Sequence, residues 1–278
     1  MTNDLLQGAY DLHIHTAPDV TTRKCDDIEL ARRLTDAGMA GCAVKCHYND
    51  TAARAVLLQK QFPHLRVVGG VTLNRAVGGI NPHAVEASAK MGGKMVWFPT
   101  MDSLSYRKFR KPDLDGGAAS SLLSACDATG KLLPACRDVL DIARQYNLVV
   151  GTGHLGPLEG MELVREGTRL GVRCVLTHAD NPANRYSREQ MLEAVQRGAV
   201  LEFSFFTVYY GRTPVEEIAG HIRAAGLENV LLTSDLGQVD SPYGDEGMAL
   251  FMLKLSAQGF SEKELRRMIR DNPRDCIG

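Results

Sequence analysis

The chain has 278 residues, of which 44% are hydrophobic and 23% are charged, and its formal net charge is -1. This size and composition predict a single α/β domain over residues 1–278 with a substantial core, while the near-zero charge excludes a broad basic surface for nucleic acid or an anionic membrane. The sequence lacks a leader-like start and an apolar run of membrane-spanning length, and its seven cysteines form no Cys-x-x-Cys pair, so we expect a reduced, cytoplasmic protein.

The first predicted element is a strand over residues 11–16, which read Asp-Leu-His-Ile-His-Thr. Side chains alternate along a strand, so Asp11, His13 and His15 are expected on one face and the two apolar residues on the other. Two imidazoles two residues apart at the end of an apolar strand can hold one divalent metal ion. A surface strand with two incidental histidines is the alternative interpretation.

After this strand, short β-branched runs alternate with amphipathic helical runs. Further strands are predicted at 41–47, 66–74, 94–100, 148–155, 174–180, 199–204 and 230–237. Helices are predicted at about 26–37, 51–62, 81–91, 135–146, 158–171, 187–198, 214–226 and 244–258. Eight β/α units in a chain of this length predict a (β/α)8 TIM barrel, whose catalytic side chains lie at the carboxyl ends of the strands. A doubly wound sheet is the alternative, but no Gly-x-Gly-x-x-Gly follows the first strand.

The one long interval in this rhythm is an insertion at about 101–134, between the fourth strand and its helix. It contains a basic stretch at 106–112 and a turn-like segment at 127–130 between two apolar runs, which predicts a hairpin. Because the insertion leaves the functional end of a barrel, we expect a lid whose basic residues meet an anionic substrate. A solvated basic loop is an equally simple interpretation.

Chemically capable residues stand at the ends of four predicted strands. His154 ends the fifth strand, His178 the sixth and Asp235 the eighth, and they join His13 and His15 from the first. Because the strand ends of a barrel meet at one mouth, these five side chains predict a metal-centred site. Nitrogen donors with a carboxylate suit zinc best, with manganese, iron or nickel as alternatives.

This ordered set of histidines and aspartate resembles the metal-site pattern of the amidohydrolase superfamily, which includes phosphotriesterase-like enzymes and the aminocarboxymuconate-semialdehyde decarboxylase group. The match spans nearly the whole chain, and the closing segment, with Asn272-Pro273 and Gly278, is similar to a tail often seen there. The resemblance implies a TIM barrel and a metal-dependent hydrolase that cleaves a C–N or ester bond in a small molecule, such as a cyclic amide or a lactone.

The resemblance also implies a role for each residue. His13, His15, His154 and Asp235 would hold one ion, and in a binuclear site His154 and His178 would hold a second. A bound divalent cation lowers the pKa of water toward about 7. Asp235 is then the candidate base, which takes the proton of water and delivers it to the leaving group. With one ion only, His178 is free to act as acid or electrophile.

One departure from the family pattern concerns the ligand that bridges two ions. Binuclear members use a carbamylated lysine or a glutamate on strand four, whereas residues 97–100 here read Trp-Phe-Pro-Thr. The second strand instead carries Lys45 and His47 on one face. Burial beside a metal would lower the pKa of Lys45, so we hypothesise that it serves as ligand or as substrate electrophile, with His47 a weaker candidate. An ion pair between Lys45 and a barrel carboxylate such as Glu202 is the alternative.

Two arginines are candidate substrate-binding residues, and three further functions remain as alternatives. Arg185 and Arg212 follow the sixth and seventh strands and could bind a substrate carboxylate bidentately, although exposed arginines are the commoner outcome. Non-oxidative decarboxylation is the alternative if the site is mononuclear. A phosphoesterase of the polymerase-and-histidinol-phosphatase type would need three metal ions, and a non-catalytic metal-binding role is the remaining option. We expect a small-molecule substrate and a homo-oligomer.

Overall fold

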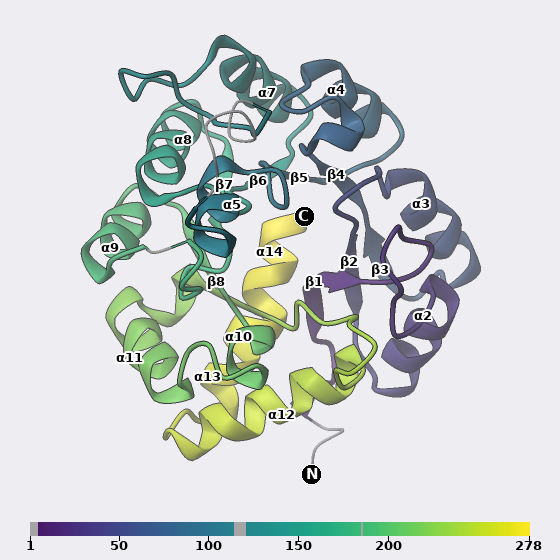
Figure 1. Ribbon diagram of the computed structural model, residues 1–278. Coiled ribbons are helices and arrows are strands. Elements are labelled where there is room, and N and C mark those ends of the chain that lie inside the picture. Colours follow the sequence, from purple (N-terminus) through teal and green to yellow (C-terminus); the bar gives the residue numbers. More distant parts are fainter. Residues whose placement is uncertain (1–4, 114–120, 185) are drawn as a thin grey trace.

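A ring of parallel strands surrounded by helices forms the protein (Figure 1). The computed structural model describes residues 5–113, 121–184 and 186–278. Its strands are β1 (Tyr10–His15), β2 (Gly41–Lys45), β3 (Arg66–Val68), β4 (Gly70–Thr72), β5 (Met95–Trp97), β6 (Val149–Gly151), β7 (Arg173–Leu176), β8 (Val200–Ser204) and β9 (Val230–Thr233). They pair in the orders β1-β2-β3 and β4-β5-β6-β7-β8-β9, every pair parallel.

Backbone hydrogen bonds join these two sheets where β9 meets β1. The amide of Asp235 donates to the carbonyl of His13, and the amide of His15 donates to the carbonyl of Leu236, both at 2.8 Å. At the other junction, β3 and β4 are consecutive pieces of the chain, separated only by Gly69. The ring is therefore continuous, and the predicted TIM-barrel fold is confirmed.

The predicted third strand at 66–74 is wrong in one respect, because the chain divides it at Gly69. Its first half pairs with β2 and its second half with β5. The Gly69 carbonyl accepts hydrogen bonds from the amides of Lys94 and Met95, at 2.8 and 3.2 Å. One predicted strand thus bridges the two sheets.

Helices cover the outside of the ring, and each predicted helix is present with ends within two residues of the expected ones. The helices of the described residues are α2 (Asp27–Asp36), α3 (Ala52–Gln61), α4 (Pro82–Lys90), α5 (Leu104–Arg110), α7 (Pro134–Gln145), α8 (Pro157–Arg169), α9 (Arg188–Gln196), α10 (Phe205–Tyr209), α11 (Val215–Ala225), α12 (Gly244–Ala257), α13 (Glu262–Arg266) and α14 (Asn272–Ile277), with short turns η1 (Arg75–Val77), η2 (Leu227–Asn229) and η3 (Arg267–Asp271). Of these, α14 does not lie outside the ring. Capping side chains fix where two of these helices begin. Asp26 accepts a hydrogen bond from the amide of Glu29 at the start of α2, and Ser187 forms a capping box with Gln190 at the start of α9. Within the described residues, no helix combines the length and apolar character that crossing a bilayer requires.

The barrel interior holds its own apolar cluster, separate from the larger core between strands and helices. Its members come from the strands and from the last helix: Leu12, Ala43, Val68, Met95, Trp97, Val149, Val175, Leu231, Cys276 and Ile277. In Figure 1, α14 lies within the ring of strands. Arg173, the first residue of β7, donates to the carbonyl of Asp275, and Asn272 donates to the carbonyl of Val230, the first residue of β9. The tail therefore closes the amino-terminal end of the barrel and leaves the carboxyl ends of the strands for chemistry.

The insertion after β5 carries α5 and the predicted hairpin. Cys126 and Leu132 form an antiparallel bridge around the turn that Asp127 begins, and the insertion is tied to the barrel where the Ser103 hydroxyl donates to the His154 carbonyl. Residues 114–120 lie outside the described residues. The role of the insertion as a lid stays a prediction.

Candidate metal centre

Six of the predicted site residues lie at the carboxyl ends of the strands and are buried. His13 and His15 belong to β1 and Lys45 ends β2, whereas His154, His178 and Asp235 lie in the turns directly after β6, β7 and β9. Every one of these residues is less than 10% exposed. The barrel thus gathers residues from 13 to 235 into one buried cluster.

A β-bulge in β1 turns both histidines inward. Asp11 pairs with Cys42 and Ile14 pairs with Val44, so three steps along β1 match two along β2, and β1 contains one extra residue. The prediction that Asp11 shares a face with His13 and His15 is therefore wrong. Asp11 instead accepts hydrogen bonds from the amide and hydroxyl of Ser234, at 3.0 and 2.5 Å, next to Asp235.

The Asp235 carboxylate is the meeting point of three imidazoles. Its Oδ1 lies 3.1 Å from Nε2 of His13 and 3.1 Å from Nε2 of His15. Its Oδ2 lies 3.4 Å from Nε2 of His178. Three nitrogen donors from β1 and β7 therefore converge on one carboxylate from β9.

Lys45 reaches the same point from β2. Its Nζ lies 2.9 Å from Nε2 of His13 and 5.6 Å from the centre of the Trp97 ring, and the residue is fully buried. Burial lowers the pKa of Lys45 to about 8, against the opposing attraction of Asp235 and Glu202. The ammonium thus loses its proton more readily than that of an exposed lysine.

Glu202 on β8 orients His13 through Nδ1, the ring nitrogen that does not face Asp235. This role of Glu202 was not predicted from the sequence. Its Oε1 lies 2.5 Å from Nδ1 of His13 and accepts from the hydroxyl of Thr233 at 2.9 Å. An imidazole whose Nδ1 proton is held by a carboxylate presents an Nε2 lone pair, as metal-binding histidines commonly do. The inward face of β8 was the available signal, because Glu202 and Ser204 alternate with Phe203.

A second layer of rings lies beside the cluster. The His47 ring centre is 4.7 Å from that of His15, and its Nδ1 lies 2.8 Å from the Thr100 hydroxyl. The His154 ring centre is 5.5 Å from that of His178 and 4.7 Å from that of Tyr106, which α5 supplies. The insertion therefore contributes one aromatic side chain to the site.

Two of the site residues have a strained backbone. His178 has φ +48° and Asp235 has φ +51°, and Asn147 is the remaining non-glycine residue with positive φ in the described chain. This left-handed conformation is unfavourable for side chains with a Cβ, and such residues gather at functional sites. Asn184 helps to hold the first turn by donating to the carbonyls of Thr177 and Gly153.

The electrostatics of the cluster favour an ionised Asp235 carboxylate beside neutral His15 and His178 imidazoles. Burial alone would raise the pKa of Asp235, yet the imidazoles of His13 and His178 hold it well below its usual range. Burial lowers the pKa of His15 to about 3 and of His178 to about 4. His13 differs: burial and Lys45 oppose its charged form, but the carboxylates of Glu202 and Asp235 raise its pKa to about 9.

These donors fit a divalent metal ion. Ligand atoms of His13, His15 and Asp235 lie within 4.8 Å of one another, as do those of His13, His178 and Glu202. The Nδ1 atom of His154 is buried and has no hydrogen-bond partner among the described residues, as expected of a nitrogen reserved for a ligand. Neutral imidazoles and ionised carboxylates are the protonation states that bind such ions.

Of the two predicted arginines, the structure describes Arg212, and its guanidinium packs on an aromatic ring away from the cluster. The Arg212 guanidinium lies over the ring of Phe206, 4.5 Å from its centre, in the turn after α10. Arg185 lies outside the described residues. A third arginine, Arg23 from the β1–α2 loop, has its Nη2 3.4 Å from Nδ1 of His15.

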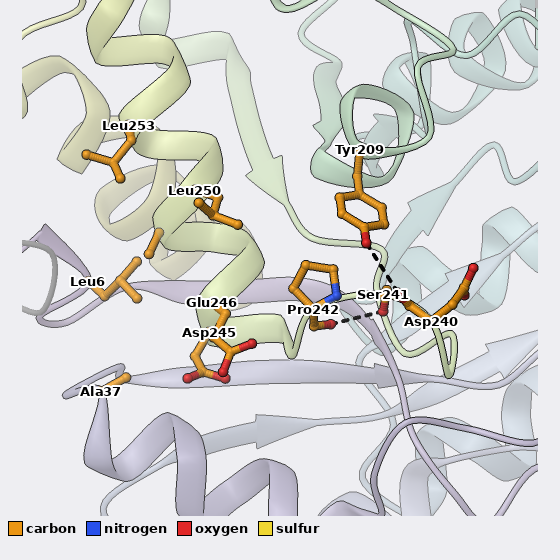
Figure 2. A pocket seen from close by; sticks show the side chains of 11 residues that line it. Leu6, Ala37, Tyr209, Asp240, Ser241, Pro242, Asp245, Glu246, Leu250 and Leu253 are labelled. Atoms are coloured by element: carbon orange, nitrogen blue, oxygen red, sulfur yellow. Dashed lines mark hydrogen bonds between the residues drawn. The ribbon is translucent and has the colours of Figure 1, made fainter.

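A surface depression of about 660 Å³ lies outside the barrel, between α12 and the loop that follows β9 (Figure 2). Its walls include Leu6, Tyr209, Pro242, Leu250 and Leu253. None of the cluster residues lines it. Its carboxylates Asp245 and Glu246 are already paired with Arg33, so the buried cluster is the better candidate for chemistry.

Comparison with protein families gives a match to a model described as a family of unknown function (DUF6282), over residues 8–202. No curated protein matches the sequence.

Solved structures share the fold. An amidohydrolase from Pseudomonas aeruginosa is 11% identical, with a TM-score of 0.67 over 99% of this chain and 98% of that one. An organophosphorus hydrolase from Deinococcus radiodurans is 16% identical, with a TM-score of 0.63 over 99% and 94%. A 2,6-dihydroxybenzoate decarboxylase from Rhizobium is 13% identical, with a TM-score of 0.57 over 98% and 98%. The chain has the fold of amidohydrolase-superfamily enzymes, as its sequence predicts.

Proposed function

The chain belongs to the DUF6282 family of unknown function, and from the site we propose that it is a metal-dependent hydrolase of the amidohydrolase type. The bond it cleaves is a C–N bond of an amide or cyclic amide, or the ester bond of a lactone, in a small molecule. One observation carries the proposal: three imidazole Nε2 atoms lie within 3.1 to 3.4 Å of the Asp235 carboxylate at the carboxyl end of a barrel.

A single metal ion would be held by His13, His15, His154 and Asp235, which leaves His178 free for the substrate; in a binuclear site His154 and His178 would hold the second ion. Nitrogen donors with a carboxylate favour zinc, followed by manganese, iron or nickel. When bound, a divalent ion would supply a Lewis acid that polarises a carbonyl and acidifies water. Glu202 keeps the His13 ring oriented through Nδ1.

Asp235 is the proposed proton carrier. The pKa of Asp235 lies well below its usual range, so its carboxylate is ionised at neutral pH and can act as an acceptor. It would take the proton of attacking water, whose own pKa a bound ion would lower. A carboxylic acid formed at such a site is strong, so it readily passes this proton to the leaving nitrogen or oxygen. His178, 3.4 Å away, is placed to hydrogen-bond the developing negative charge on the substrate.

Lys45 is the residue that distinguishes this site. Its buried Nζ, 2.9 Å from a proposed ligand atom of His13, serves as a ligand or as an electrophile toward the substrate. Lys45→Met preserves most of the side-chain volume and removes the amine, so we expect turnover to fall by about two orders of magnitude or more. Unchanged metal content and turnover in this variant would remove Lys45 from the mechanism.

Decarboxylation is the second candidate, and the residues at the end of β5 favour it. Residues 97–100 read Trp-Phe-Pro-Thr, which supply no carboxylate or lysine to bridge two ions, and one ion suits a non-oxidative decarboxylase. A phosphoesterase of the polymerase-and-histidinol-phosphatase type would require three ions per chain.

Elemental analysis and isotope labelling test these alternatives. We expect one or two ions per chain, predominantly zinc, and turnover of amides or lactones that is lost on chelation and restored by zinc. In ¹⁸O-labelled water, a hydrolase places the label in its organic product, whereas a decarboxylase does not. Fewer than about 0.2 ions per chain, without activation by zinc or manganese, would contradict the proposal.

A further inference from the structure

Arg23 lies beside the proposed metal centre, in the loop between β1 and α2. Its side chain is only 6% exposed, its Nε donates to Asp19 at 2.7 Å, and its Nη2 lies 3.4 Å from Nδ1 of His15. Its Nη1 makes no hydrogen bond to the described residues. The guanidinium is therefore anchored through Nε, and its Nη2 lies against a proposed metal ligand.

The loop that carries Arg23 is fixed by several contacts. The Ala17 amide donates to the Cys25 carbonyl at 2.9 Å, and the Lys24 amide donates to the Gly237 carbonyl at 2.9 Å. The Asp19 side chain is fully buried, and the Cys46 thiol also lies within hydrogen-bond distance of it, at 3.4 Å. The position of the guanidinium is thus built into the fold.

Whether Nη2 of Arg23 hydrogen-bonds His15 depends on which nitrogen of the His15 ring carries the proton. Arginine is only a donor, so a hydrogen bond to Nδ1 of His15 requires an unprotonated Nδ1. A His15 that binds metal through Nε2 carries its proton on Nδ1, and it can no longer accept. Metal loading therefore releases Nη2, which leaves both terminal nitrogens of Arg23 available to a ligand.

Two other nearby cations have partners away from the cluster. Lys24 donates its Nζ to the carbonyl of Val239 at 3.1 Å, and Arg212 stacks on Phe206. Lys45 is fully buried against His13 and already has a proposed role as ligand or electrophile. Arg23 is thus the remaining one of these cations that contacts a proposed ligand, His15, and it does so with a planar guanidinium.

We propose that Arg23 binds a carboxylate of the substrate next to the reacting group, so that the enzyme acts on small carboxylic acids. This inference rests on the proposed metal-dependent function. The planar fork of arginine matches a carboxylate with two parallel hydrogen bonds, which is stronger and more specific than a single point charge. A neutral analogue of the substrate would lose that interaction.

Binding of dicarboxylates tests the proposal without a known substrate. Succinate and glutarate are compared by calorimetry with butyrate and valerate, each on zinc-loaded protein, because the second carboxylate is the one that Arg23 would bind. We expect the native protein to prefer the dicarboxylates by about tenfold or more, as two charge-assisted hydrogen bonds allow. Arg23→Gln should lose this preference, Arg23→Lys should retain part of it, and the control Arg212→Gln should keep it.

Zinc content separates the possible failures. Native protein that takes up neither zinc nor manganese would refute the metal-dependent function itself. If the native protein holds zinc but shows no dicarboxylate preference, or if Arg23→Gln retains that preference, Arg23 is not a carboxylate site. Loss of zinc from both Arg23 variants would instead assign Arg23 to the support of His15 and overturn the proposal. If inorganic phosphate displaces succinate from the native protein and binds the Arg23→Gln variant much more weakly, the group that Arg23 recognises is a phosphate and the carboxylate proposal is overturned.

Discussion

Glu202 acts on the proposed metal through another residue, because its contact is with the far nitrogen of His13. Glu202→Gln preserves the size and the hydrogen bonds but removes the charge that keeps the proton on Nδ1. We expect zinc affinity to fall by about 10- to 100-fold, measured by competition with a chromogenic chelator. The control is Glu159→Gln in α8, which alters a carboxylate bound to Ser124 and Ala125. Equal zinc affinities of the Glu202 variant and native protein would contradict this role.

Asp180 gives the molecule a pH-dependent stability. Its carboxylate accepts from Thr207 at 2.5 Å while Oδ1 has no partner among the described residues, and burial raises its pKa from 3.8 to about 7. A raised folded-state pKa means that the folded form binds the proton more tightly, so its stabilising contribution is present at low pH and is lost as pH rises from about 4 to 7.

Asp180→Asn should remove that pH dependence. Relative to the variant, the native protein is expected to lose on the order of 4 kcal/mol of unfolding free energy between pH 4 and pH 8, as measured by urea denaturation of both proteins in the presence of chelator. Parallel stability curves for the two proteins would show that Asp180 does not titrate in this range.

The chemistry of single residues was largely predictable from the sequence, whereas their orientation was not. His13, His15, His154, His178 and Asp235 are identified by type and by position after apolar runs. The role of Glu202 depends on which nitrogen of His13 it meets, and the roles of Asp11 and Arg23 depend on a bulge and a loop. The contact of Glu202 with His13 spans 189 positions, while the bulge and the Arg23 loop depend on how β1 pairs and how its loop folds back, which no local pattern records.

At the scale of elements, the turn after β6 places His154 by a close backbone approach. Gly153 has φ +61°, and a Cβ on it would overlap the Phe98 carbonyl oxygen. Gly211 has nearly the same φ, +63°, but no atom of the described residues lies within 4 Å of the position that a Cβ would take there. The two glycines thus share the conformational requirement and differ in the space around them.

Alanine substitutions at Gly153 and Gly211 separate the effect of steric crowding from that of the left-handed backbone. Gly211→Ala should cost only about 1–2 kcal/mol, the penalty of a left-handed alanine. Gly153→Ala must in addition move β6 away from β5, so we expect a larger loss of stability together with reduced zinc binding. Thermal unfolding and zinc titration of both variants provide the comparison; similar losses in both would indicate that the approach of Gly153 to Phe98 does not position His154.

The order of the eight β/α units was predictable from the alternation of apolar runs and helical patterns, and so were the ends of the predicted helices. Several strands are shorter than predicted, because the chain turns at the barrel mouth before the apolar run ends, as where β6 is Val149–Gly151 instead of 148–155. The bulge in β1 and the division of the third strand at Gly69 were not predictable, since both arise from the need to fit neighbouring strands into a closed ring. The insertion was predicted as a hairpin, but the Tyr106 contact with His154 follows from α5, which the basic composition of that stretch obscures.

At the scale of the whole molecule, α14 and the candidate metal centre lie at opposite ends of the barrel. Ile277 is 1% exposed and packs among the inward residues of the strands. Ile277→Ala should lower the unfolding free energy by about 2–4 kcal/mol and leave zinc stoichiometry unchanged, as judged by urea denaturation and elemental analysis. Leu158→Ala is the surface control, since that side chain is 83% exposed. A loss of zinc without a loss of stability would contradict the separation of the two ends.

The junction between β1 and β9 makes the proposed metal a reporter of the last step of folding. His15 and Asp235 are 220 positions apart in sequence, and they meet only when the first and last strands hydrogen-bond. Contacts of such long range form slowly, because a large loop must close before they stabilise the chain. A chain still emerging from the ribosome holds the first two histidines long before the aspartate, so firm metal retention marks a finished barrel, and a half-barrel fragment would let the ion exchange freely.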